Sequence, residues 1–208
     1  MAARIERLVT SGTFSLDGGT WDVDNNVWIV GDDSEVIVID PAHSAEAVAE
    51  AVGERRTVAI LLTHGHDDHI RAARETADRL QAPLHLHPAD AMLWETVYDS
   101  APDAEIADGD VFSVAGVELT ALHTPGHSPG STSFTAPQLD AVFTGDTLFQ
   151  GGPGATGRSF SDFPLIIESI RGKLLTLPAE TVVHTGHGDT TTIGDEAPHV
   201  DEWIARGH

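Results

Sequence analysis

Short apolar runs that end in polar loops recur along the chain and predict β-strands. Most are rich in β-branched residues, which favour extended backbone, and each is shorter than an ordinary helix. The run at 117–122 alternates between apolar and polar positions, whereas 57–62 is apolar enough for a buried strand. The predicted strands are 35–39, 57–62, 117–122, 141–143 and 181–183.

Helical patterns occupy the segments between these runs, and Ser44 and Asp68 stand where side chains could cap a first turn. The predicted helices are 44–52, 68–80, 88–96, 163–175 and 194–206. Because strands and helices interleave while many strands are hairpin-like neighbours, the pattern predicts an α/β (α+β) sandwich of two mixed sheets with helices outside. With 208 residues and no repeat or linker, the chain is expected to form one domain, 1–208.

Four predicted strands are followed closely by a histidine or an aspartate, with glycine nearby. The strand at 57–62 leads to His64, and the later ones lead to His127, Asp146 and His187. Active-site residues gather on loops at strand ends, and glycine lets such loops turn sharply. We therefore expect these loops to carry the functional site.

The hexapeptide HGHDDH at 64–69 has three imidazoles and a carboxylate at the spacing H-x-H-x-D-H, at a strand-to-helix junction. Such ligands suit borderline divalent metals. His64 and His66, two apart in an extended turn, project the same way and can share one ion. Asp68 and His69 enter the next helix and can reach a second ion. A polar loop with unrelated histidines is the alternative, and this spacing disfavours it.

Composition narrows the function further. The chain has 33 acidic and 11 basic residues, a formal charge of −22, which disfavours nucleic acids and anionic membranes as partners. It has no cysteine, which excludes disulfides and thiolate chemistry, yet it has 12 histidines. No apolar run approaches the ~18 residues of a membrane span, and charged residues interrupt the N-terminal segment. We expect a cytoplasmic protein.

The hexapeptide resembles the signature of the metallo-β-lactamase superfamily, and three later residues match the superfamily pattern in order. His127, within TPGHSPG, is similar to the third ligand of the first metal. Asp146, within TGDT, resembles the bridging carboxylate, and His187, within TGHG, resembles the last ligand of the second metal. The resemblance covers nearly the whole chain and implies a four-layer αββα sandwich.

The resemblance implies two divalent metals side by side, with a shared water whose pKa falls toward ~7. Asp146 would bridge the metals and Asp68 would also orient the bridging hydroxide, so these two are the expected catalytic residues. Zinc is the expected metal, with iron or manganese as alternatives. The implied ligands are His64, His66 and His127 for the first metal, and Asp68, His69 and His187 for the second.

Within the superfamily, the segment GDTLFQGG at 145–152 resembles short relatives of glyoxalase II, which hydrolyse hydroxyacyl thioesters. The resemblance implies a small-molecule thioester substrate, and we expect a monomer or homodimer. Too few residues follow His187 for the helical C-terminal domain of full-length glyoxalase II. Arg158, in a glycine-rich loop after Asp146, either pairs with a substrate carboxylate or is a surface arginine.

Two other activities stay open. Acyl-homoserine lactonases resemble this site but rely on a pocket tyrosine, and the only tyrosine here is Tyr98, distant in sequence from every ligand. Persulfide dioxygenases are similar through the same hexapeptide but use one iron held by two histidines and one aspartate. Their segment Gly-Arg-Thr-Asp-Phe is matched here only by the longer stretch 157–163.

Several other polar residues have open roles. Asp40, at the end of a predicted strand, resembles a position that supports the metal loop. His123 and His184 precede ligands, and either support loops or merely end strands. His85 and His87 alternate, so we expect them to share a solvated strand face.

Overall fold

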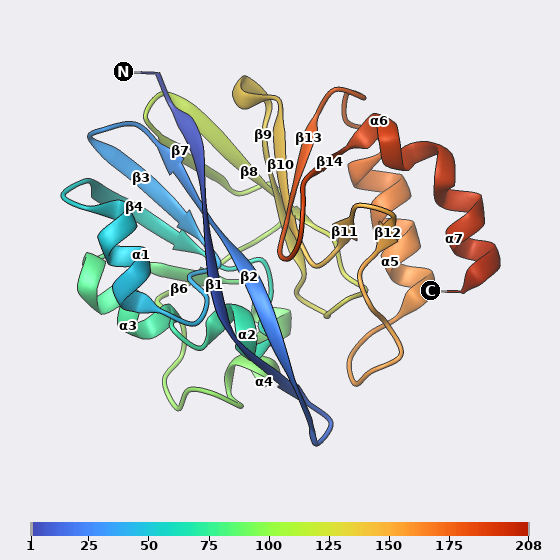
Figure 1. Ribbon diagram of the computed structural model, residues 1–208, viewed down its shortest axis with the longest axis horizontal. Coiled ribbons are helices and arrows are strands. Elements are labelled where there is room, and N and C mark those ends of the chain that lie inside the picture. The colour runs from blue at the N-terminus through green and yellow to red at the C-terminus, as the bar shows by residue number, and fades with distance from the viewer. Residues whose placement is uncertain (1, 208) are drawn as a thin grey trace.

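The computed structural model describes residues 2–207 as two six-stranded sheets packed face to face, with helices on both outer faces (Figure 1). The first sheet has the order β1-β2-β3-β4-β5-β6, and the second has the order β14-β13-β10-β9-β8-β7. Each sheet contains parallel and antiparallel pairs. The predicted αββα sandwich is confirmed. Among the described residues, no helix is both long and apolar enough to cross a bilayer.

All five predicted strands are present, with small shifts at their ends. The first sheet consists of β1 (Arg4–Leu16), β2 (Gly19–Gly31), β3 (Glu35–Ile39), β4 (Arg56–Leu61), β5 (Leu84–Leu86) and β6 (Ala104–Glu105). The second consists of β7 (Val111–Val114), β8 (Val117–His123), β9 (Thr132–Ala136), β10 (Ala141–Gly145), β13 (Val182–Thr185) and β14 (Thr191–Thr192). A separate small hairpin contains β11 (Leu148–Phe149) and β12 (Gly152–Pro153).

Helices lie where the sequence predicts them, but four of the five predicted helices are divided. Ser44 caps the intact one, since its Oγ accepts from the N–H of Ala47 at 3.2 Å. The helices are α1 (Ala45–Val52), α2 (Asp67–Ile70), α3 (Ala73–Leu80), α4 (Ala91–Trp94), α5 (Phe163–Ser169), α6 (Ile193–Glu196) and α7 (Val200–Arg206). Shorter helical turns are η1 (Pro88–Asp90), η2 (Pro137–Leu139), η3 (Ile170–Leu174) and η4 (Ala197–His199).

The prediction of one helix over 68–80 with Asp68 as its N-cap is wrong. The chain forms α2, a turn and then α3, and Asp68 lies inside α2. Its carboxylate accepts from Asn25 Nδ2 at 3.0 Å rather than from the helix backbone. The break in the C-terminal helix has a local cause, because Pro198 lies in η4 between α6 and α7 and has no N–H to donate.

Apolar side chains fill three layers. On β3, Val36 and Val38 pack in the outer layer with α1 and α3, whereas Ile37 and Ile39 pack between the two sheets. This division follows from the alternation of side chains along a strand. A third layer packs α5 and α7 on the outer face of the second sheet. This packing fixes the position of the two sheets relative to each other, and with it the position of the loops at their edges.

β1 and β2 form a long hairpin that the apolar pattern did not predict. The strands pair along their full length and turn at Asp17-Gly18, which have φ of 52° and 79°. Asp-Gly suits a two-residue hairpin turn because both positions need positive φ. The turn projects beyond the sheets, past α2 and α4 (Figure 1). Near the turn, neither face of the hairpin is packed regularly against the rest of the protein. Buried and exposed side chains therefore do not alternate along β1.

Candidate metal centre

Asp40 anchors the loop that follows β4. The parallel pairing of β3 and β4 places the loops after both strands at the same sheet edge. Asp40 is 1% exposed and accepts from the N–H and O–H of Thr63 at 2.8 and 2.7 Å. Its Oδ2 lies 3.0 Å from His69 Nδ1. The predicted support by Asp40 is confirmed, since it holds the turn and orients the His69 ring.

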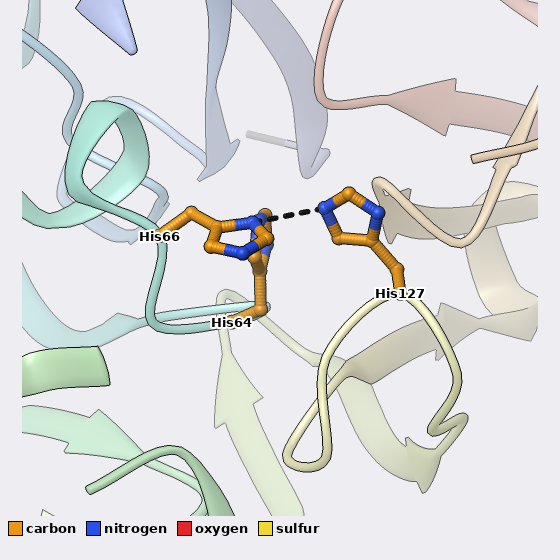
Figure 2. A group of neighbouring side chains, drawn as sticks. All are labelled: His64, His66 and His127. Carbon is orange, nitrogen blue, oxygen red and sulfur yellow. Dashed lines mark hydrogen bonds between the residues drawn. The ribbon is translucent and has the colours of Figure 1, made fainter. Parts of the chain in front are cut away.

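His64, His66 and His127 form the first group of converging side chains (Figure 2). The first two come from the loop after β4, and His127 comes from the loop between β8 and β9. His66 Nδ1 lies 3.0 Å from His127 Nε2. In two of these rings the opposite nitrogen is engaged elsewhere. His64 Nδ1 lies 3.0 Å from Thr63 Oγ1, and His127 Nδ1 donates to the Ala155 carbonyl at 2.9 Å. Such contacts fix the rings of metal-binding histidines.

Asp68, His69 and His187 form the second group. Asp68 Oδ2 lies 3.5 Å from His69 Nε2 and 3.3 Å from His187 Nε2, and the two ring nitrogens are 3.2 Å apart. His187 follows β13, and its Nδ1 donates to the Asp24 carbonyl at 2.8 Å. The Nδ1 atoms of His69 and His187 are thus both hydrogen-bonded outside the group, and their Nε2 atoms face one another.

Asp146 lies between the two groups, directly after β10. Its Oδ1 is 3.3 Å from His69 Nε2, and its Oδ2 is 3.4 Å from His187 Nε2 and 3.6 Å from His127 Nε2. A Cβ on Gly186 would stand 2.1 Å from Asp146 Oδ1, so glycine is required beside it. The structure thus brings all seven predicted ligand residues into one cluster.

Several buried polar atoms of this cluster have no hydrogen-bond partner. They include His64 Nε2 and Asp146 Oδ1. A buried polar atom left unsatisfied costs ~1–3 kcal/mol. Imidazole nitrogens and carboxylate oxygens are ligands of zinc, iron and manganese, so a cation would satisfy such atoms. The cluster therefore fits divalent metal ions.

Charge is divided unevenly between the two groups. Burial, together with the charge of His69, holds the pKa of His64 well below its ordinary value, and burial lowers the pKa of His66 to about 3. Burial also opposes the charge on His69, but Asp68 and Asp146 raise its pKa. Against the same burial, Asp146 raises the pKa of His187 to about 10. His64 and His66 are therefore neutral, whereas His69 and His187 hold protons that a metal must displace.

We expect metal binding to tighten as the pH rises from about 6 to about 8. His187 keeps its proton below a pKa of about 10, so a metal that takes its Nε2 must release that proton. One proton released per metal raises the apparent affinity ~10-fold per pH unit. Zinc titration against a chromogenic chelator measures this, and calorimetry in two buffers counts the protons. An affinity that is independent of pH would contradict it.

Three successive residues of β2 hold the second group, and sequence reasoning missed them. The Asp24 carbonyl accepts from His187, and Asn25 donates to Asp68. Asn26 Nδ2 donates to backbone carbonyls on both sides of His187, at 3.0 and 2.9 Å. Asn25 and Asn26 are 0% and 1% exposed. Two adjacent asparagines before an apolar strand were the available signal, because buried amides need partners.

Asp90 ties the two histidine loops of the first group together. It is fully buried and accepts from Gly65 N at 2.8 Å, Ser128 Oγ at 2.7 Å and Gly130 N at 2.5 Å. Gly65 lies between the first two histidines, and Ser128 follows His127. One carboxylate therefore sets the spacing of this group. Asp90 lies in a segment that reads only as helix, so the sequence alone did not indicate it.

A cleft of about 240 Å³ opens onto the cluster. The predicted Arg158 lies at this cleft, with its guanidinium 3.9 Å from the centre of the Trp21 ring and 5.4 Å from that of Phe14. The backbone N–H and Oγ of Ser159 donate to Asp17 at 3.1 and 2.6 Å, which joins this loop to the β1–β2 turn. The cleft is lined by Phe14, Trp21, Val23, His66, Asp68, His127, Asp146, Ala155, Arg158, Ser159, Ser161 and His187.

His123 and His184 differ in role. His123 Nε2 donates to the Pro129 carbonyl at 2.8 Å and so supports the loop that carries His127. His184 packs against the rings of Trp28 and Phe143, with centroids 4.5 and 4.9 Å away. His123 is thus a loop support, whereas His184 is a packing residue.

The expected solvated face shared by His85 and His87 is wrong. β5 ends at Leu86, so only His85 lies on the strand. His85 is half-buried against Phe112, and His87 stacks on His123 with ring centroids 4.1 Å apart. The second sheet covers both rings, which the alternation of a single strand could not show.

Comparison with known proteins agrees with this geometry. The family model described as Metallo-beta-lactamase superfamily matches residues 20–187. The probable metallo-hydrolase YqgX of Bacillus subtilis is 35% identical over 183 residues, which cover 81% of this chain and 87% of that protein. Hydroxyacylglutathione hydrolase GloC of Haemophilus influenzae is 34% identical over 181 residues, which cover 79% of this chain and 85% of that protein.

Solved structures show the same likeness. The BLEG-1 B3 metallo-beta-lactamase has a TM-score of 0.77 at 31% identity, covering 91% of this chain and 97% of that one. TTHA1623 in a di-iron-bound form has a TM-score of 0.74 at 32% identity, covering 90% of this chain and 96% of that one. The sequence match and the converging histidines and aspartates agree, and the chain belongs to the metallo-β-lactamase superfamily as one of its metal-dependent hydrolases.

Proposed function

We propose that this protein hydrolyses a small-molecule thioester with the help of two divalent cations, zinc foremost. The observation that carries the proposal is the position of Asp146, whose two oxygens face ring nitrogens from both groups of ligands. The likeness to a hydroxyacylglutathione hydrolase supports the thioester as the bond cleaved. A formal charge of −22 disfavours nucleic acids as the substrate.

The residues of the cleft have separate duties in this reaction. Two cations, when bound, would acidify a shared water and polarise the substrate carbonyl. Asp68 and Asp146 line the cleft, where a carboxylate can accept a hydrogen bond from the attacking water and orient it. Phe14, Trp21 and Val23 form an apolar wall that excludes bulk water from an acyl group. A thiolate leaves without a strong general acid, so thioester cleavage needs no further side chain.

The position of Tyr98 favours this reaction over lactone hydrolysis. Its hydroxyl donates to the Ile70 carbonyl at 2.8 Å, and it packs on Trp94. Among the described residues that line the cleft there is no tyrosine. A lactonase mechanism that relies on a pocket tyrosine therefore lacks that residue here.

A panel of acyl thioesters tests the proposal on protein loaded separately with zinc, manganese and iron. We expect two metals per chain and a kcat/KM above ~10⁴ M⁻¹s⁻¹ for the preferred thioester. Thiol release is followed with a chromogenic disulfide, and metal content is measured on the same samples. Two bound metals without thioester turnover would contradict the proposal. So would one iron per chain with oxygen uptake on a persulfide.

Arg158 is expected to bind a carboxylate of the substrate. Its guanidinium rests on two aromatic rings, and no carboxylate lies within ion-pair distance, whereas seven other arginines of the described chain form ion pairs with acids. Arg158→Gln should raise KM ~10-fold for a thioester that bears a carboxylate, equivalent to ~1.4 kcal/mol. For an uncharged thioester, KM should stay within ~2-fold, because no charge-assisted contact is lost.

Arg171→Gln is the matched control, since Arg171 is exposed on η3 and does not line the cleft. It removes the same charge from the chain without touching the substrate. Equal rises of KM for charged and uncharged thioesters in Arg158→Gln would show that the arginine only shapes the cleft.

A further inference from the structure

His43, Asn25 and Asp68 form a hydrogen-bonded chain that runs from the protein surface into the metal cluster. His43 Nε2 lies 2.7 Å from Asn25 Oδ1, and Asn25 Nδ2 donates to Asp68 Oδ2 at 3.0 Å. Asn25 is completely buried and His43 is half-buried. Asp68 Oδ2 also lies 3.3 Å from His187 Nε2. His43 thus reaches the second metal group through one amide.

The fold holds the His43 ring in place from two sides. His43 has a φ of 58°, which few residues other than glycine adopt, in the short turn between β3 and α1. The turn is fixed because Thr10 Oγ1 donates to the Ala42 carbonyl at 2.9 Å. The ring lies against Gly12, where a Cβ would stand 2.1 Å from His43 Nδ1. β1 therefore has a glycine where the histidine ring needs room.

The direction of the amide follows from its two neighbours. An oxygen of Asn25 turned toward the Asp68 carboxylate would set two acceptors against each other, which a buried site does not tolerate. Asp68 therefore selects the NH₂ group, and His43 selects the oxygen by donating its Nε2–H. Asn25→Leu would remove the amide itself. A ring without Nε2–H at position 43 would remove the hydrogen bond that fixes the amide oxygen.

We propose that Asn25, oriented by His43, is a positioning residue that turns Asp68 Oδ2 toward the second metal. The proposal rests on the proposed function, because Asp68 is placed there as a metal ligand and as the acceptor for the attacking water. The amide is uncharged, so it holds the carboxylate without competing with a cation for its charge. Loss of the amide frees Asp68 to rotate, which weakens the second metal and misplaces the water.

The experiment compares His43→Phe, which keeps a ring and loses the donor, with His43→Gln, whose amide can still donate to Asn25. Contacts of this kind alter metal affinity or activity by ~10–100-fold when removed. We expect His43→Phe to weaken the second zinc ~10-fold and to lower kcat ~10-fold, with KM within ~2-fold. His43→Gln should recover most of both losses. The losses of zinc affinity and of kcat in Asn25→Leu should be larger than those in His43→Phe.

Zinc affinity is measured by chelator competition without substrate, so this readout does not depend on thioester turnover. His85→Phe is the matched control, because His85 is half-buried against an aromatic ring and does not contact the cluster. Urea unfolding of the metal-free variants shows whether they are folded.

Two results would overturn the proposal. One is a second-zinc affinity in His43→Phe equal to that of the wild type. The other is an equal loss in His43→Phe and His43→Gln, which would make the shape of the ring, and not its donor, responsible. If the wild type binds two zinc ions but cleaves no thioester, the proposed function fails while the zinc affinities still decide the role of Asn25.

Discussion

Asp146→Asn should lower kcat/KM for the preferred thioester by at least ~10³-fold, which corresponds to ~4 kcal/mol of transition-state stabilisation. Both oxygens of Asp146 face imidazole nitrogens, at 3.3 to 3.6 Å, in a buried cluster. An amide of the same shape has no negative charge and offers an NH₂ group where one oxygen stood. Metal content per chain should fall from two toward one, and steady-state kinetics on the same samples measures the loss.

Asp140→Asn is the control for this change, because Asp140 is exposed just before β10 while Asp146 lies just after it. The same chemical substitution at the far end of one strand separates an effect on the cluster from an effect on the fold. Asp146→Asn protein that keeps two metals and a tenth of the activity would show that the carboxylate does not join the two groups.

Asp40→Asn should lower the free energy of unfolding of the metal-free protein by ~2–4 kcal/mol. The Asp40 carboxylate accepts two hydrogen bonds from Thr63 and faces His69 Nδ1, with 1% of the residue exposed. The amide would set its NH₂ group against two of these donors and leave buried groups unpaired, at ~1–3 kcal/mol each. Urea unfolding in the presence of a chelator measures the change.

Backbone strain does not confound this second experiment. Asp40 has a φ of 51°, and asparagine adopts that region at least as readily as aspartate. Asp140 has a φ of 49° at an exposed position, so Asp140→Asn is again a matched control. If Asp40→Asn and Asp140→Asn unfold within ~0.5 kcal/mol of each other, the loop after β4 does not depend on this carboxylate.

The elements that sequence reasoning found share a local signal. The strand at 35–39 coincides with β3, and Ser44 caps α1, because β-branched runs and cap residues act over a few neighbours. The apolar pattern did not predict the β1–β2 hairpin, because its turn projects beyond the sheets, where no regular apolar face is needed. The predicted N-cap at Asp68 was wrong because Asp68 lies inside α2 and its carboxylate accepts from Asn25 in the cluster.

The candidate site shows the same contrast. Four ligand residues could be named from the spacing of the hexapeptide at 64–69, and three more from the resemblance to the superfamily. The structure brings all seven together. Asp90 could not be named, since it contacts the loop at 64–69 from a distant part of the chain and carries no motif of its own. For Asn25 the only signal was its pairing with Asn26, and its contact with Asp68 appears only in the structure. His43 gave no signal at all, because its role exists only through its contact with Asn25.

The amino-acid sequence by itself determined which side chains can hold metal and which strands and helices carry them. The reason is that donor chemistry and apolar periodicity depend on residues that are close together in the chain. Only the tertiary structure decided how each donor is aimed. Asp40, Asp90 and the segment Asp24–Asn26 do this through hydrogen bonds between segments far apart in the chain, and such bonds exist only once the sheets have packed.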